Sequence, residues 1–297
     1  MIRDFVYLKA NTVQETLNLL EQHKDDYKII CGGQSLLILM RQGLVAPENL
    51  IDIKSVRELS YIKFSSKGGL RIGATTTHRE IEKSSVIKEH FPVLVDMEEN
   101  LASIQTRSWG TIGGNLAHAD PAGDPGPLLM ALDARVSMAN KKRIRTLPLE
   151  EFFIDFFETA LEEGELLLEV QMPPVLSRTA TAYEKFNIIK NDQPIVSVAA
   201  SITLDEDGLI CKDARLVLGG AASVPLRARV AEAMLKGKKM SEDLLEKVGN
   251  KASEEADPVA DIHASEEYRR HLLKALTKRT AKRAWEDART PAHRGGF

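Results

Sequence analysis

Two segments with adjacent glycines, far apart in the sequence, most strongly constrain how this chain can fold. The first glycine segment, residues 31–35, reads Cys-Gly-Gly-Gln-Ser, and the second glycine segment, residues 111–115, reads Thr-Ile-Gly-Gly-Asn. Adjacent glycines let a backbone adopt positive φ and approach a ligand closely, and successive N–H groups there can form an anion-binding concavity. Ser35 also opens a helix-like run, whose positive end favours an anion. We therefore interpret the two segments as two sides of one pyrophosphate site.

Either segment alone is most often a simple turn, so the interpretation depends on the pair and on the residues directly after the second segment. The spacing is not Gly-x-Gly-x-x-Gly, and no Gly-Lys-Ser/Thr comes after either segment. This argues against both a dinucleotide-binding Rossmann fingerprint and a P-loop.

The second glycine segment continues into residues 116–125, Leu-Ala-His-Ala-Asp-Pro-Ala-Gly-Asp-Pro. Together with Gly-Gly-Gln-Ser in the first segment, it resembles the flavin-binding medium subunit of the molybdenum hydroxylases, over nearly the whole chain. That family includes xanthine dehydrogenase, aerobic carbon monoxide dehydrogenase and related aldehyde and heterocycle oxidoreductases. The resemblance implies an α+β protein with two domains. The first has the FAD-binding fold of the PCMH or molybdopterin dehydrogenase type and is built from α/β subdomains. The second is a C-terminal α+β domain of the CO dehydrogenase flavoprotein type.

The resemblance also implies that FAD is bound without a covalent link. One side of its pyrophosphate would contact Gly32, Gly33, Gln34 and Ser35, and the other side Thr111, Ile112, Gly113, Gly114 and Asn115. Asp124 would hydrogen-bond the sugar or polyol hydroxyls, and Leu101 and Leu167 would line the flavin. Lys185 would lie near the ring edge, where a cation favours the anionic reduced flavin and raises its potential.

Other roles stay open for several of these residues. Asp124 is also compatible with a turn or an N-cap, the two leucines with plain core positions, and Lys185 with a solvated strand face. Arg107 and Trp109, just before the second glycine segment, are expected either to shape the loop or to meet a partner. Gln193 stands where several relatives place an aromatic residue against the flavin, which leaves the shielding of the ring open.

Composition excludes several functions. With 43% hydrophobic and 28% charged residues the chain can bury a sizeable core, and its net charge of −3 lacks the basic footprint of a nucleic-acid-binding protein. No apolar run approaches the roughly 20 residues that span a bilayer. Residues 1–5 lack the apolar core of a secretory signal, so we expect a cytoplasmic protein.

Cysteine and histidine usage gives no sign of a metal site. The two cysteines, Cys31 and Cys211, cannot supply the four thiolates usual for an iron–sulfur cluster. We interpret Cys31 as a small buried hydrophobic residue. His118 and Asp120 could be drawn as a ligand pair, but the family's own His-Ala-Asp-Pro segment explains them. We expect no metal ligands and no catalytic side chain.

The order of sequence patterns predicts the domain organisation. We expect an FAD-binding domain over residues 1–177, with subdomains at about 1–55 and 56–177, then an α+β domain over 178–285 and a flexible tail over 286–297. The double proline at 173–174 marks the boundary. Strands are predicted over 28–31, 50–53, 70–74, 135–138, 143–147, 166–172, 182–186, 195–204 and 214–218. Helices are predicted after Thr12, Ser35 and Thr77, over 92–102, and near Pro127, Pro225, Ser241 and Ser265.

The resemblance implies an oxidoreductase subunit that transfers electrons. They would arrive singly from iron–sulfur clusters on a small partner subunit and leave as a pair to NAD⁺, oxygen or a quinone. The substrate would be oxidised at a molybdenum cofactor on a large partner subunit. Two alternatives stay open: a self-contained, non-covalent flavin oxidoreductase of the same fold, and a flavin-carrying interaction protein without turnover.

Overall fold

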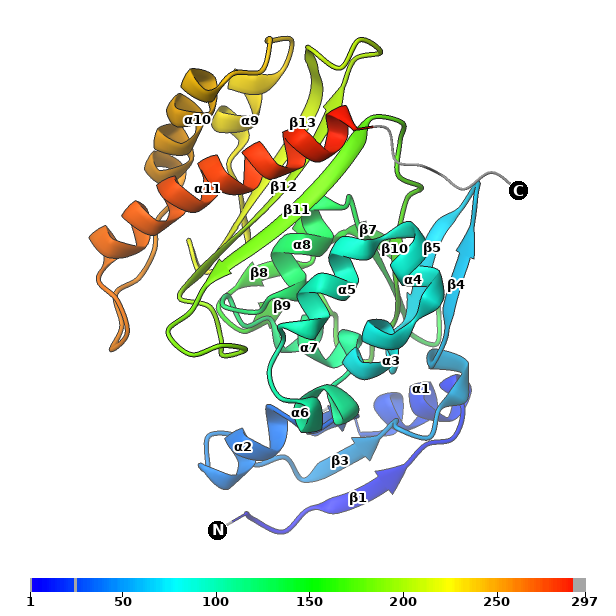
Figure 1. Cartoon of the computed structure of the whole chain (residues 1–297). Helices are drawn as coiled ribbons and strands as arrows, with labels where there is room; N and C mark the ends of the chain where they lie inside the picture. Colours follow the sequence, from blue (N-terminus) through cyan, green and yellow to red (C-terminus); the bar gives the residue numbers. More distant parts are fainter. Residues whose placement is uncertain (1, 24–25, 291–297) are drawn as a thin grey trace. The chain divides into compact units, whose positions relative to one another are not determined.

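The chain forms two compact units that interrupt each other in sequence. The computed structural model describes residues 2–23 and 26–290 (Figure 1). Unit 1 consists of Met1–Ala119 and Ala134–Met172, and unit 2 of Asp120–Asp133 and Pro173–Phe297. The short segment Asp120–Asp133 therefore belongs with the C-terminal part of the chain, although the chain then returns to unit 1.

The first sheet of unit 1 is small and parallel. Strand β3 (Asn49–Asp52) lies between β1 (Val6–Lys9) and β2 (Tyr27–Ile30), and both neighbours pair with it in parallel. Helix α2 (Leu36–Arg41) follows β2, so the predicted strand–loop–helix–loop–strand arrangement around the first glycine segment is confirmed.

Helix α1 (Val13–Gln22) begins where the sequence predicts it. The Thr12 hydroxyl accepts a hydrogen bond from the Glu15 N–H, which satisfies one of the unpaired donors of the first turn. The Glu15 carboxylate returns the contact to the N–H of Asn11 rather than to Thr12. Leu17 and Leu20 on the inner face of α1 pack with Ile51 of β3 in one buried cluster.

The second sheet of unit 1 is antiparallel. Its order is β4 (Ile62–Ser65), β5 (Gly69–Gly73), β10 (Leu166–Met172), β6 (Arg135–Ala139) and β7 (Ile144–Pro148), with Val170 of the central strand opposite both Ile72 and Val136. The four strands predicted here are confirmed within about one residue at each end. Strands β8 (Phe153–Asp155) and β9 (Glu158–Thr159) form a separate hairpin, and short 3₁₀ turns cover Arg57–Leu59 and Leu149–Glu151.

Five helices of unit 1 connect β5 to the end of the second glycine segment. They are α3 (His78–Lys83), α4 (Ser85–His90), α5 (Pro92–Glu99), α6 (Ile104–Trp109) and α7 (Ile112–His118). The predicted cap at Thr77 is a full capping box with Glu80. The helix predicted over 92–102 ends at Glu99. Helices α4 and α6 were not predicted, because each spans fewer than two turns and shows little hydrophobic periodicity.

Helix α7 corrects the prediction for the second glycine segment. Residues 111–115 were expected to form a loop, yet Thr111 is an N-cap and Ile112–Asn115 form the first turn of α7. Each glycine in a helix interior costs about 1 kcal/mol relative to alanine, so the pattern argued against a helix. The Thr111 hydroxyl, which accepts from the Gly114 N–H, and the burial of Ile112 against the core offset this cost.

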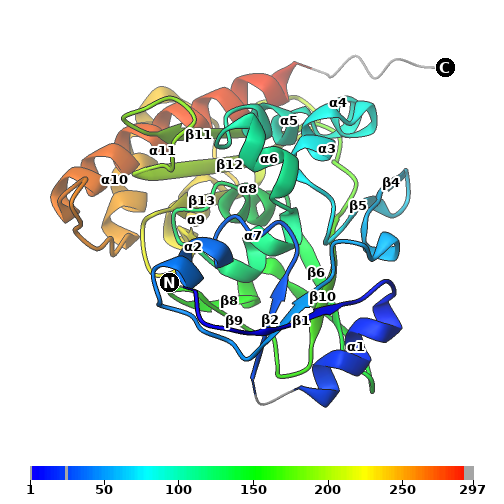
Figure 2. The same cartoon turned by 90° about the horizontal axis from the view of Figure 1, so that it is seen from below.

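Unit 2 is one antiparallel sheet with helices on both faces. Strands β11 (Thr179–Phe186), β12 (Val196–Leu204), β13 (Cys211–Gly219) and β14 (Leu226–Arg227) follow one another in order, which confirms the predicted antiparallel strands and the turn near Gly208 (Figure 2). Helix α8 (Pro125–Ala131) packs on β12 and β13. Gly219 permits this approach, because a Cβ there would lie 2.7 Å from Cγ of Pro127.

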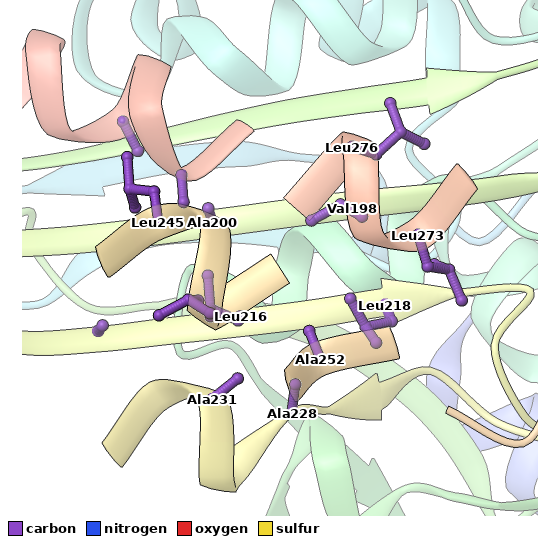
Figure 3. Close-up of a cluster of buried hydrophobic side chains, with 14 of the residues drawn as sticks. Val198, Ala200, Leu216, Leu218, Ala228, Ala231, Leu245, Ala252, Leu273 and Leu276 are labelled. Atoms are coloured by element: carbon purple, nitrogen blue, oxygen red, sulfur yellow. The ribbon is translucent and has the colours of Figure 1, made fainter. Parts of the chain in front are cut away.

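Three helices cover the other face of this sheet: α9 (Arg229–Leu235), α10 (Glu242–Glu255) and α11 (Glu266–Arg289). Their apolar side chains meet those of β12 and β13 in one buried cluster, which includes Leu245, Leu273 and Leu276 from the helices and Val198, Ala200 and Leu218 from the strands (Figure 3). The predicted starts at Ser241 and Ser265 are confirmed as N-caps.

Two C-terminal predictions need correction. The first helix was expected near Pro225 but begins at Arg229, because Leu226 and Arg227 pair with β13 instead. The flexible tail was expected to begin at residue 286, but α11 continues to Arg289. The part of that prediction covering residues 291–297 lies outside the described residues.

Candidate functional site

The first glycine segment packs directly against the chain that enters the second. A Cβ on Gly32 would lie 2.3 Å from the carbonyl oxygen of Trp109 and 2.8 Å from Cα of Gly110, so only glycine fits at this position. Gly33 has φ +69°, which L side chains rarely adopt. Both segments belong to unit 1, and the structure brings them together as the sequence predicts.

Backbone donors of the first glycine segment lack an acceptor in the part of the chain that the structure describes. The N–H groups of Gly32, Gly33, Gln34 and Ser35 donate no hydrogen bond to any acceptor within residues 2–23 and 26–290. The segment is only partly buried, and the Ser35 hydroxyl makes no capping bond at the start of α2. Consecutive unpaired N–H groups leading into a helix fit an anionic group such as a phosphate.

The second glycine segment is different, because its backbone donors are already used. The Ile112 N–H donates to the Thr76 carbonyl at 3.0 Å and the Gly113 N–H to the Ala74 carbonyl at 2.9 Å. A Cβ on Gly113 would lie 2.6 Å from the same Ala74 oxygen. These N–H groups thus have acceptors within the protein and Gly113 serves the close packing of α7, while the assignment of these glycines to FAD stays a prediction.

Side chains of the second glycine segment remain available to a ligand to different degrees. Asn115 is half-buried and Gly114 is exposed, whereas the side chain of Ile112 is fully buried in the core. The Thr111 hydroxyl is buried and accepts from the Gly114 N–H. Asn115 thus keeps a polar side chain that is partly accessible, and Ile112 acts as a packing residue.

Leu101 lies in the connection between α5 and α6, where a buried arginine fixes the backbone. Nη1 of Arg107 donates to the carbonyls of Leu101 and Ala102, both at 2.7 Å, and Ala102 has φ +45°. Nε of Arg107 donates to Oε2 of Glu82 at 2.9 Å. Arg107 was considered for shaping the loop of the second glycine segment, and the structure shows that it holds the connection between α5 and α6.

Leu167 lies on the central strand β10 and is 5% exposed. It faces Met138 of β6, next to a register shift between Leu167 and Glu169. Leu101 is 6% exposed, so both leucines are buried positions of unit 1 and are compatible with a cofactor wall and with plain core alike.

In unit 2, Asp124 and Lys185 form an ion pair. Nζ of Lys185 lies 3.0 Å from Oδ2 of Asp124, and each side chain is 8% exposed. Nζ also donates to the Asp192 carbonyl at 3.0 Å. The sequence assigned the two residues separate roles, one on the polyol and one at the ring edge. The structure instead joins their charges in one buried pair.

Tyr183 is a member of this cluster that the sequence analysis missed. Its hydroxyl donates to Oδ1 of Asp124 at 2.6 Å. Burial, followed by the negative charge of Asp124, raises the pKa of Tyr183 well above its ordinary value, so the phenol stays protonated. Positions 183 and 185 on β11 point to the same face of the sheet, and this period of two was the signal that could have identified Tyr183.

The two cysteines show no sign of reactive thiolates. Burial raises the pKa of Cys31 to about 11 and that of Cys211 to about 12. Over the described ranges, no group of three or more His, Cys, Asp or Glu side chains is placed to hold a metal ion. No helix among the described residues is long and apolar enough to cross a membrane.

Comparison with known proteins gives the class of this chain. Residues 3–175 match the family described as "FAD binding domain in molybdopterin dehydrogenase", and residues 181–284 match the "CO dehydrogenase flavoprotein C-terminal domain". Together the two matches define an FAD-binding oxidoreductase subunit, with a flavin domain followed by a domain of the CO dehydrogenase type.

Three similar proteins support this assignment. The chain is 35% identical to the 6-hydroxypseudooxynicotine dehydrogenase complex subunit alpha of Paenarthrobacter nicotinovorans, covering 96% of each chain. It is 33% identical to the glyceraldehyde dehydrogenase medium chain of Sulfolobus acidocaldarius, covering 94% of this chain and 98% of that one. A solved carbon monoxide dehydrogenase from Hydrogenophaga pseudoflava superposes with a TM-score of 0.92 at 30% identity, over 96% of this chain and 99% of that one.

The chain therefore belongs to the FAD-binding medium subunits of the molybdenum hydroxylase family. The predictions of its α+β fold, of FAD as cofactor and of an oxidoreductase subunit are confirmed.

Proposed function

We propose that this chain is the FAD-carrying electron-transfer subunit of a multi-subunit molybdenum hydroxylase. In this proposal it receives electrons from iron–sulfur clusters on a small partner subunit and passes them to NAD⁺, oxygen or a quinone. A large partner subunit with the molybdenum cofactor oxidises the substrate. The unpaired N–H groups of residues 32–35 are the observation that carries the proposal, because they suit the pyrophosphate of FAD.

The names of similar proteins support the assembly. One relative is a "dehydrogenase complex subunit" and another a "medium chain", and this chain covers nearly all of both. The two cysteines of this chain are fewer than the four thiolates that usually hold an iron–sulfur cluster, so its electron donor would lie on another polypeptide.

In this proposal, unit 1 supplies the residues that bind the pyrophosphate of FAD. In unit 1, the N–H groups of residues 32–35 bind phosphate oxygens, and the side chains of Thr111 and Asn115 add polar contacts. Leu101 and Leu167 supply an apolar wall that excludes water. Bound FAD supplies the ability to take up electrons singly and release them as a pair, while the protein holds it and sets its potential.

In unit 2, the proposal assigns Lys185 and Asp124 to the flavin end of the cofactor. Asp124 and the Asp192 carbonyl hold the Lys185 ammonium in one place, and Tyr183 holds Asp124. If the ammonium lies nearer the ring, the pair favours the anionic reduced flavin; if the carboxylate lies nearer, the pair disfavours it.

Spectroscopy of the purified chain tests the proposal. We expect absorption bands at about 370 and 450 nm, as for an oxidised flavin, and release of FAD on heat denaturation. Failure of folded, FAD-free protein to bind added FAD would contradict the proposal. Rapid substrate oxidation by the single chain would instead support a self-contained flavin oxidoreductase. Co-purification of an iron–sulfur protein and a molybdenum protein would support the complex.

A further inference from the structure

Lys54 lies just beyond the parallel sheet of unit 1, at the same edge as the first glycine segment. Strands β2 and β3 run in parallel with Ile30 opposite Asp52, and the Ile53 N–H donates to the Ile30 carbonyl. The first glycine segment follows β2, and Lys54 follows β3 two residues after the strand ends. Ligands of parallel α/β units bind outside the carboxyl ends of the strands, which is the edge that these residues share.

Trp109 connects Lys54 to that segment. Nζ of Lys54 lies 3.2 Å from the centroid of the Trp109 ring, while the carbonyl oxygen of Trp109 packs against Gly32. The indole is 52% exposed and Lys54 is exposed, so both stay accessible to a ligand. A cation over an indole ring is attracted by the ring's negative face, which fixes the direction of an otherwise mobile ammonium.

The same edge also carries negative charge. Asp52 accepts from the Tyr7 hydroxyl and from the Lys54 N–H, and Glu80 caps α3 beside Thr77. Burial is the main factor that raises the pKa of the Cys31 thiol; the charges of Asp52 and Glu80 raise it further, and that of Lys54 lowers it. The strand register itself places Asp52 and Lys54 at this edge, next to the start of the first glycine segment.

A pyrophosphate at this segment would be repelled by both carboxylates and attracted by one ammonium. We propose that Lys54, oriented by the indole of Trp109, is a further cofactor-binding residue whose ammonium neutralises the pyrophosphate of FAD. The inference rests on the proposed function, because it assumes that the pyrophosphate lies on residues 32–35.

Binding measurements on full-length chain test the inference. Lys54→Met removes the ammonium, and Lys63→Met is the matched control, because Lys63 is an exposed lysine of the same unit with Nζ 4.6 Å from the Tyr61 ring centroid. We expect Lys54→Met to lower the affinity for FAD about tenfold or more, as for loss of a charge-assisted hydrogen bond. Lys54→Arg and Lys63→Met should bind FAD like wild type. The difference in FAD affinity between wild type and Lys54→Met should shrink with added salt, which screens exposed charges.

ADP, used as a competitor of FAD, locates the contact. Because ADP carries the pyrophosphate without the flavin, Lys54→Met should lower the affinity for ADP by a factor similar to that for FAD. Trp109→Leu should lower the affinity for FAD less than Lys54→Met does. If the indole acts through Lys54, the effect of Trp109→Leu should vanish in the Lys54→Met background.

Equal FAD affinity of Lys54→Met and Lys63→Met would overturn the inference. So would an unchanged ADP affinity, because the lost contact would then lie elsewhere on FAD. A wild-type chain that binds no FAD would instead overturn the proposed function itself. The two failures are therefore distinguishable.

Discussion

Nε of Arg107 lies 2.9 Å from Oε2 of Glu82, and both side chains are almost completely buried. The same guanidinium holds the carbonyls of Leu101 and Ala102. A buried charge pair contributes little net stability by itself, but removal of one partner leaves the other charge unpaired. The connection between α5 and α6 therefore depends on Arg107.

Arg107→Gln should strongly destabilise unit 1. We expect a loss of roughly 3 kcal/mol in the free energy of unfolding, as for other broken buried pairs. Arg79→Gln is the matched control, because Arg79 also binds Glu82, at 2.5 Å, but its side chain is 35% exposed. Its loss should stay within about 1 kcal/mol. Urea unfolding measures the free energy of unfolding of both variants. Equal losses in that free energy would show that the two carbonyl contacts of Arg107 do not contribute to stability.

Acid should unfold the protein through three buried glutamates. Burial by itself raises the pKa of Glu82, Glu165 and Glu169. Hydrogen bonds from arginine side chains lower the pKa by more than burial raises it, so each folded-state pKa lies below the ordinary value of 4.5. A group whose pKa is lowered on folding stabilises the protein above its unfolded-state pKa and loses that contribution as the pH falls through the folded value. The free energy of unfolding should therefore fall as the pH drops below about 4.5.

Glu82→Gln provides the control for this pH dependence. The variant should be less stable than wild type at pH 7, and its stability should change less between about pH 5 and pH 2, because one titrating group is gone. Urea unfolding over this range measures both slopes. Parallel curves for the two proteins would mean that Glu82 does not contribute to acid unfolding.

The two adjacent glycines of α7 should respond differently to alanine. A Cβ at position 113 would clash with backbone atoms of Ala74, whereas at position 114 it would meet only the Thr111 hydroxyl, at 2.9 Å. Overpacking of a buried contact costs about 1–3 kcal/mol, and alanine recovers about 1 kcal/mol of helix propensity. Gly113→Ala should lower the thermal unfolding midpoint, and Gly114→Ala should leave it nearly unchanged. The reverse order would contradict the packing role of Gly113.

Substitution of Lys185 and of Asp124 should shift the flavin potential in opposite directions, given the proposed function. Lys185→Met removes a cation and should lower the potential, whereas Asp124→Asn removes an anion and should raise it. A tenfold change in relative affinity for the two redox states corresponds to about 30 mV for a two-electron couple, which is the shift we expect at minimum. Potentiometric titration measures it, with the exposed Lys190→Met as control. Shifts of the same sign would mean that the pair does not act through its charges.

Local signals in the sequence predicted local structure well. Ser and Thr caps fixed the starts of α1, α3, α10 and α11, because a cap depends on residues only three positions apart. The apolar run at residues 166–172 was predicted as a strand, and β10 has the same bounds, Leu166 to Met172. The Gly-Gly dipeptide at residues 113–114 misled the prediction, because its reason is a contact with Ala74, which is distant in sequence.

Part of the candidate site could not be predicted, because it depends on distant pairings. Asp124 and Lys185 are 61 residues apart and Glu82 and Arg107 are 25 apart, and no local pattern in the sequence indicates that these charges meet. The assignment of individual residues to FAD came from the family resemblance and stays a prediction. By contrast, the unpaired N–H groups at residues 32–35 are a property of the folded backbone.

The position of α8 restricts how this protein can be divided. All of Pro125–Ala131 is buried, and the helix packs on β12 and β13, both of which lie far downstream in the sequence. A fragment cut after Met172 would carry an apolar helix without its sheet, and a fragment starting at Pro173 would carry a sheet with one bare face. Exchange of the C-terminal half between relatives, in the laboratory or by recombination, would therefore require α8 to be exchanged with it.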